Sequence, residues 1–108
     1  MAFTDKSEFN VPRHIVQKGG VNPETITTNK TLVYSDSQYQ LLRNNTSSLD
    51  CILASYKDGA SFWIKNRASS THNIVVKDED ANTIATLATG EAVFVVSDGA
   101  AWWDVIKG

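Results

Sequence analysis

The sequence predicts an all-β fold: an antiparallel sandwich of about eight strands, similar to a jelly roll, that follows an extended N-terminal arm. From Ile26 onward, short runs of β-branched and aromatic residues alternate with turn residues at intervals of roughly 8 to 12 positions. No long window keeps the 3.6-residue period of an amphipathic helix. Before Ile26 the apolar residues follow neither period, and Pro12 and Pro23 interrupt any helix. We therefore expect an arm over residues 1–25 and a β-sandwich domain over residues 26–108.

The arm carries apolar side chains that have no periodic position in a sheet or helix. Gly19 and Gly20 supply a flexible break near its end. Exposed apolar groups need a contact, so we expect the arm to lie against a partner. A disordered terminus, or a strand folded back on its own domain, are the alternatives. The residues predicted to bind the partner are Phe3, Phe9, Val11 and Ile15.

The strands after the arm are recognised by their composition and by the turns between them. Polar or glycine-containing clusters interrupt the chain at 35–37, 44–48, 57–59, 67–71, 79–82, 89–91 and 98–99. The segments between these turns, rich in Val, Ile, Thr, Leu and aromatic residues, are predicted strands. They are 26–34, 39–43, 49–55, 61–66, 72–78, 83–88, 92–97 and 101–106.

Composition and charge exclude several classes of protein. The chain has 108 residues, enough for one domain, with ten basic and twelve acidic residues. This near-balance does not favour nucleic acid as a partner. No apolar run approaches the roughly 20 residues needed to cross a membrane, and the first six residues lack the apolar centre of a secretory signal. The single cysteine excludes a disulfide framework and a multi-cysteine metal site.

Residues that would carry catalysis are scarce. Cys51 alternates with Leu49 and Leu53 on one face of a strand, so we expect a small buried hydrophobic side chain there. His14 and His72 have no recognisable triad partners. The acidic segment 78–80 lacks the ligand spacing of a calcium loop, and its composition is typical of a hairpin tip. We therefore predict no enzyme, no catalytic residue, no metal and no cofactor.

The tryptophans are the strongest candidates for recognition. Trp102 and Trp103 are adjacent, so on a strand one ring faces the core and the other faces outward. Trp63 points away from the face that carries Phe62 and Ile64. Outward tryptophans on a small domain favour burial by another chain. We predict an oligomer interface at Trp63, Trp102 and Trp103, with a carbohydrate site, or both rings inside one core, as alternatives.

From Leu32 to Val105 the layout resembles small β-sandwich domains of tailed-phage virion proteins. The residues that carry the likeness are Tyr39-Gln40-Leu41-Leu42, Gly59, Phe62, Ile64, Asn66, Ile74, Val76, Ile84, Leu87, Gly90, Val93, Val95, Asp98-Gly99 and Trp102-Trp103. They form a packing pattern rather than a catalytic motif. A separate short chain with an arm is most similar to the capsid decoration, or cement, proteins of that group.

This resemblance implies a structural role outside the capsid. The expected protein is made in the host cytoplasm, becomes part of the virion and binds the major capsid protein as a homotrimer, without nucleic acid or membrane. Repeated weak contacts would then stabilise neighbouring capsid subunits. The alternatives are a tail-fibre or tailspike module that binds a host receptor or carbohydrate, and a cellular carbohydrate-binding domain.

Overall fold

The strand-forming segments give nine strands and no helix in the computed structural model, which describes residues 19–44, 46–55, 59–69 and 71–108. The strands are β1 (Val21–Thr25), β2 (Lys30–Leu32), β3 (Tyr39–Arg43), β4 (Leu49–Leu53), β5 (Ser61–Asn66), β6 (Ile74–Lys77), β7 (Thr83–Leu87), β8 (Ala92–Ser97) and β9 (Trp102–Lys107). The all-β prediction is confirmed. Strands β2 to β9 correspond to the eight predicted segments, and β1 is additional.

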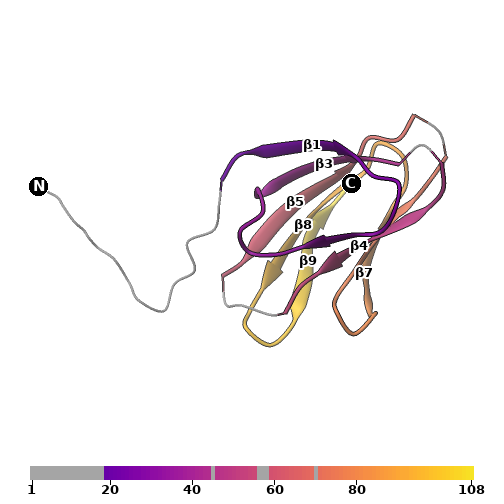
Figure 1. The fold of residues 1–108 in the computed structure, drawn as a ribbon. Coiled ribbons are helices and arrows are strands. Elements are labelled where there is room, and N and C mark those ends of the chain that lie inside the picture. Colours follow the sequence, from indigo (N-terminus) through magenta and orange to yellow (C-terminus); the bar gives the residue numbers. More distant parts are fainter. Residues whose placement is uncertain (1–18, 45, 56–58, 70) are drawn as a thin grey trace, which may run out of the picture.

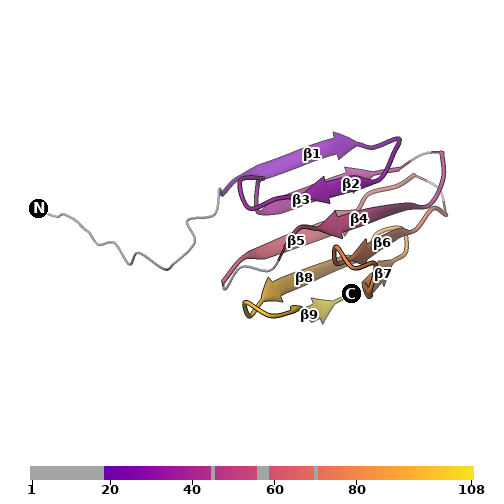
Figure 2. The same cartoon turned by 60° about the horizontal axis from the view of Figure 1, so that its bottom comes forward.

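The nine strands form two mixed sheets that face each other across one core (Figures 1 and 2). The five-stranded sheet has the order β1-β3-β5-β8-β9, and the four-stranded sheet has the order β2-β4-β6-β7. From β1 to β6 the chain changes sheet at every connection. The pairs β1–β3, β3–β5, β2–β4 and β4–β6 are consequently parallel. Only β5–β8, β6–β7 and β8–β9 are antiparallel among the described strands.

The prediction of wholly antiparallel sheets is therefore wrong for the first six strands. Antiparallel neighbours can be joined by a tight hairpin, whereas parallel neighbours need a crossover. Here the crossover between β1 and β3 is β2 in the other sheet, and the later parallel pairs follow the same rule. The connections are as short and polar as hairpin turns, so composition does not distinguish the two. The mixed pairing also departs from the antiparallel strands of a jelly roll.

The predicted boundary at residue 25 is also wrong, because β1 is part of the five-stranded sheet. Its five residues pair with β3 in register from Val21 with Tyr39 to Thr25 with Arg43. Pro23 had indicated an irregular arm. On an edge strand, however, a missing N–H is tolerated. Within the described residues, the five-stranded sheet therefore includes residues 21–25.

The core lies between the sheets and is filled by alternate residues of the strands. Its largest fully buried side chain, Phe62, lies beside the core ring of Trp102, with ring centroids 6.1 Å apart. The fully buried apolar side chains are Leu32, Leu42, Cys51, Leu53, Ala60, Ile64, Ile74, Val76, Leu87, Val93 and Val95. Period-two alternation thus identified the core correctly, including Cys51.

Buried Asn66 joins the two sheets at the end of β5. Its Nδ2 donates to the His72 carbonyl at 2.8 Å and to the Leu87 carbonyl at 2.9 Å. Its Oδ1 accepts from the Ala68 N–H at 2.9 Å. These bonds satisfy backbone groups that would otherwise be buried without partners, so this polar side chain stabilises the connection.

The open edge between β1 and β2 is closed by polar side chains. The Glu24 Oε1 lies 2.9 Å from the Lys30 Nζ. The Asn22 Nδ2 donates to the same Glu24 oxygen at 2.9 Å and to the Gln40 Oε1 at 2.8 Å. Inward-pointing charged groups at a sheet edge discourage pairing with another chain. This edge is therefore protected rather than prepared for strand addition.

Candidate functional site

The outer face of the five-stranded sheet carries an apolar side chain on every strand at one level. Strand pairing aligns Val21 with Tyr39, Tyr39 with Trp63, Trp63 with Phe94, and Phe94 with Ile106. We call these five residues the outer apolar row. Neighbouring strands are about 4.8 Å apart, so the row extends roughly 20 Å across the sheet. Tyr39 is 44% exposed, Val21 56% and Ile106 59%, which leaves much of the row uncovered.

Further apolar residues widen this row. Leu41 lies between Pro23 and Lys65 at the next outward level. A hollow of about 260 Å³ opens beside the row, lined mainly by Tyr39, Leu41, Trp63, Lys65 and Ala92. Contiguous exposed apolar surface of this kind marks an interaction site.

The aromatic rings on this face are held in place. Trp63 stacks on Phe94 with ring centroids 4.7 Å apart. The Trp103 Nε1 donates to the Asp98 Oδ2 at 2.9 Å, although Trp103 is 56% exposed. Asp98 in turn accepts from the Ala100 and Ala101 amides, both at 2.8 Å. The Ala100 bond, followed by the Trp103 bond, lowers the pKa of the Asp98 carboxyl, which therefore stays charged. Rings fixed before binding lose little entropy on contact.

The outer face of the four-stranded sheet differs in character. Thr31 pairs with Ile52 and Val75 pairs with Thr86, so apolar and hydroxyl side chains alternate. The Lys77 Nζ lies 3.2 Å from the Asp50 Oδ2 on the same face. Polar and charged side chains therefore interrupt the outer face of the four-stranded sheet. Variants on this face can serve as controls for variants on the five-stranded sheet.

The predicted interface tryptophans separate into two groups. Trp63 and Trp103 lie on the outer face of the five-stranded sheet. Trp102 is only 4% exposed, and its Nε1 donates to the Ala54 carbonyl at 3.0 Å. The prediction that one of the adjacent rings is in the core is confirmed. Trp102 is the core ring and is not part of the exposed surface, so its place at the predicted interface is corrected.

The predicted arm contacts cannot be placed in this way. Phe3, Phe9, Val11 and Ile15 lie outside the described residues, as does His14. Their role at a partner surface stays a prediction.

Sequence reasoning missed most of the outer apolar row. Tyr39, Phe94 and Ile106 were read only as strand residues, yet each occupies the outward position opposite Trp63 or Phe94. The available signal was that β8 is apolar on both faces, as its sequence Ala-Val-Phe-Val-Val shows. A strand that is apolar on both faces needs cover on both faces.

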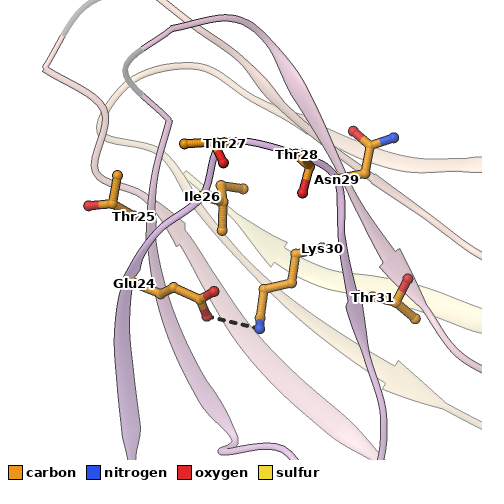
Figure 3. A pocket seen from close by; sticks show the side chains of 8 residues that line it. All are labelled: Glu24, Thr25, Ile26, Thr27, Thr28, Asn29, Lys30 and Thr31. Atoms are coloured by element: carbon orange, nitrogen blue, oxygen red, sulfur yellow. Dashed lines mark ion pairs between the residues drawn. The ribbon is translucent and has the colours of Figure 1, made fainter.

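The second concave site is formed by the connection between β1 and β2 (Figure 3). This pocket of about 330 Å³ is lined by residues 24–31. Figure 3 shows Glu24 and Lys30 pointing toward each other, and their ion pair neutralises the only two charges of the lining. The bond from Lys30, and then that from Asn22, lowers the pKa of the Glu24 carboxyl. Both charges are engaged with each other, so the pocket offers a ligand mainly threonine hydroxyls and backbone.

The described residues bring together no nucleophile with a base. Cys51 is fully buried, and burial raises the pKa of its thiol to about 12. His72 lies in the β5–β6 connection, where its carbonyl accepts the Asn66 bond. Asp78 binds the Asp80 and Asn82 amides through its Oδ1, which forms the predicted hairpin tip. No group of three metal-binding side chains occurs within the described part of the chain.

No protein-family model, curated protein or solved structure matches this chain. Within the ranges that the structure describes, no helix is long and apolar enough to cross a membrane.

Proposed function

We propose that this protein is a virion structural protein that acts as a homotrimer, binds the outer capsid surface and stabilises neighbouring capsid subunits. The observation that carries the proposal is the outer apolar row. A parallel sheet is normally covered on both faces. In the single chain, the parallel strands β1, β3 and β5 are covered on one face only. A protein partner would cover the other.

The arrangement of the two sheets supports a more specific description of the fold. We infer a β-sandwich, since residues of both sheets share one core cluster. Such a block is stiff because its interior is close-packed. A stiff block with one apolar face suits a protein that holds other subunits in fixed positions.

The assignment to a capsid depends on the resemblance to decoration proteins. The residues that carry that resemblance, such as Phe62, Ile64, Ile74 and Val95, are core residues here. They support the likeness in packing, and the partner itself is inferred from the family likeness. The arm residues Phe3, Phe9, Val11 and Ile15 are the proposed capsid contacts, and the outer face is the proposed trimer contact.

A carbohydrate-binding tail-fibre or tailspike module is the second candidate. The observation in its favour is the hollow between Tyr39 and Trp63, because sugar rings stack on aromatic faces. A sugar site also needs polar groups that fix the ligand's orientation. Lys65 is the only charged side chain lining this hollow, and its Nζ donates to the Gly90 carbonyl at 3.3 Å. A protein surface fits the row better than a sugar does.

Co-sedimentation tests the proposal. The full chain is mixed with empty shells assembled from the major capsid protein that is encoded nearest to it, and bound protein is measured against concentration. We expect saturable binding that weakens at least tenfold when residues 1–18 are removed, because several apolar contacts are lost. The matched control is Ile52→Ala on the opposite face, which we expect to bind as the full chain does.

Two outcomes would contradict this function. Absence of saturable binding to the shells would refute the capsid role. Quenching of tryptophan fluorescence by a panel of host glycans, abolished by Trp63→Ala, would favour the tail-fibre alternative.

A further inference from the structure

Among the described residues, the charged side chains outside the printed ion pairs gather mainly at the two ends of the strands, carboxyl groups at one end and cations at the other. The strands β1, β3 and β5 run one way, and β2, β4 and β6 return the opposite way (Figure 2). The loops therefore gather at two ends. Of the described residues, one end holds the connecting residues 33–38, 54–55, 59–60, 78–82 and 98–101, and the other holds 26–29, 44, 46–48, 67–69, 71–73 and 88–91.

The described residues of the first end are acidic. They include five carboxyl side chains and no lysine or arginine, while Lys57 and Asp58 lie outside the described residues. The carboxyl groups are Asp36, Asp78, Glu79, Asp80 and Asp98. Two of the loops are joined by hydrogen bonds, since the Trp102 Nε1 donates to the Ala54 carbonyl and the Gly59 N–H donates to the Ser97 carbonyl, both at 3.0 Å. We call this set of loops the acidic end.

The other end is basic. Arg43, Lys65 and Arg67 lie at the ends of β3 and β5, and none of them forms an ion pair within the described residues. The other described charges at this end are paired with each other, because the Lys30 Nζ lies 2.9 Å from the Glu24 Oε1 and the Lys107 Nζ lies 3.3 Å from the Glu91 Oε1. We call Arg43, Lys65 and Arg67 the basic end.

Local contacts leave this positive charge uncompensated. Leu42 pairs with Asn66, and the Arg67 N–H continues the ladder to the Leu42 carbonyl at 2.7 Å, so Arg43 and Arg67 are cross-strand neighbours. Like charges in that position are destabilising. The Nε atoms of both arginines are also buried without a hydrogen-bond partner. An acidic surface placed against this end would offset the repulsion between the two guanidinium groups.

We propose that copies of this chain meet head to tail, with the basic end of one on the acidic end of the next, in a three-fold ring whose axis runs along the outer apolar rows. This inference rests on the proposed homotrimer and adds the arrangement of its subunits. Charge complementarity between the two ends selects a second copy as the occupant.

The direction of the strands relative to the ring axis follows from the same charges. Strands parallel to the axis would place equivalent ends side by side, where three basic ends would repel. Strands that run around the axis bring opposite ends together instead. The outer apolar row crosses the strands at right angles, so in this arrangement it lies along the axis and packs against its two copies. Such contacts are heterologous and close into a ring when the rotation fits.

Charge reversal tests the arrangement. The variants are Arg43→Glu with Arg67→Glu at the basic end, Glu79→Lys with Asp80→Lys at the acidic end, and all four together. Light scattering and sedimentation equilibrium give the mass and the dissociation constant, and circular dichroism verifies folding. We expect each end variant alone to raise the dissociation constant at least tenfold, because the exchanged side chains then meet side chains of like charge across the contact. The fourfold variant should return to within about threefold of the unmodified chain, since the four exchanged side chains are again opposite in sign across the contact.

A matched control exchanges charges away from both ends. Asp50→Lys with Lys77→Glu reverses an ion pair on the outer face of the four-stranded sheet, and we expect no change in association. Trp63→Ala should weaken association at all salt concentrations, because the row itself loses contact.

The outcomes separate this inference from the proposed function. A chain that remains monomeric, an end variant that associates normally, or a fourfold variant that is not restored would each overturn the ring. Trimers that fail to sediment with shells would leave the ring standing and refute the capsid role. Monomers that bind shells would overturn the ring and leave the capsid role standing.

Discussion

Cys51 shows how the packing of one residue determines its chemistry. It is 0% exposed on the core side of β4, so its thiolate would lose all contact with water. Burial therefore raises the pKa of the thiol from 9.0 to about 12. A cysteine in this state is a small apolar side chain rather than a nucleophile.

This placement predicts a pH-dependent effect of Cys51→Ala. The folded thiol has the raised pKa, so its contribution to stability is complete below pH 9.0 and is lost as the pH rises toward about 12. At neutral pH the variant should be less stable by about 1 kcal/mol, because a small buried group is removed. Between about pH 8 and about pH 10 that difference should shrink by about 1 kcal/mol.

Urea unfolding of both proteins at the two pH values measures this difference. Other groups that titrate at alkaline pH affect both proteins equally, so their contributions cancel in the difference between the variant and the unmodified chain. A constant difference, or rapid labelling of the native thiol by a bulky maleimide, would contradict the buried position.

At the scale of elements, β1 shows what an edge strand contributes. It covers the edge of β3 along five residues, and behind that edge lie buried Gln40 and Leu42. Without β1 these side chains would border solvent, and the outward backbone groups of β3 would lose their partners.

Truncation on either side of β1 should therefore give different results. Removal of residues 1–18 leaves all nine strands, and we expect little change in the free energy of unfolding. Removal of residues 1–25 should cost at least about 2 kcal/mol, since ladder hydrogen bonds of about 1 kcal/mol each are lost. Thermal unfolding followed by circular dichroism compares the two. Equal midpoints would show that β1 contributes nothing to stability.

The elements also show how far the sequence leads. Alternation identified β3, β5 and β8 with their correct bounds, because inward residues such as Gln40, Phe62 and Val93 are followed by outward ones along each strand. Alternation did not predict whether neighbouring strands pair in parallel or antiparallel. Parallel and antiparallel neighbours bury the same alternate side chains, so the hydrophobic pattern is the same for both.

Only part of the candidate site was predicted from the sequence, and the reason is related. Trp63 was identified because an outward tryptophan is unusual by itself. The outer apolar row emerges only when the register places Tyr39, Phe94 and Ile106 at the same level, and register depends on partners distant in sequence. Nothing in the local sequence of β9 marks Ile106 as a neighbour of Phe94.

The whole molecule has a net charge of −2, yet this small value conceals two charged ends. The acidic end and the basic end are separated by the length of the strands. Opposite charges at that separation interact weakly within one chain in salt solution, because the Debye length is about 10 Å at 0.1 M. The same charges act strongly only when another molecule brings them into contact.

Association of the chain should therefore depend on salt in two parts. Raising the salt from about 0.05 M to about 1 M shortens the Debye length from over 10 Å to about 3 Å, which weakens contacts between the ends. Burial of the outer apolar row is not screened, so we expect the dissociation constant to rise several-fold and then level off. Sedimentation equilibrium across this range measures the curve. Association that strengthens steadily with salt would show that the ends make no attractive contact.

The alternation of strands between the sheets has a consequence for the order in which the chain folds. Among the described strands, only β6–β7 and β8–β9 are paired neighbours in sequence. Such hairpins form in about 1–10 μs, whereas each parallel pair must first close a longer loop. We therefore expect the transition state to be organised around the C-terminal third of the chain, with β1 joining last. Since a ribosome releases the N-terminus first, β1 to β5 would emerge with only parallel partners available to them, and the second of the two hairpins that organise the fold would follow only once β9 has been made.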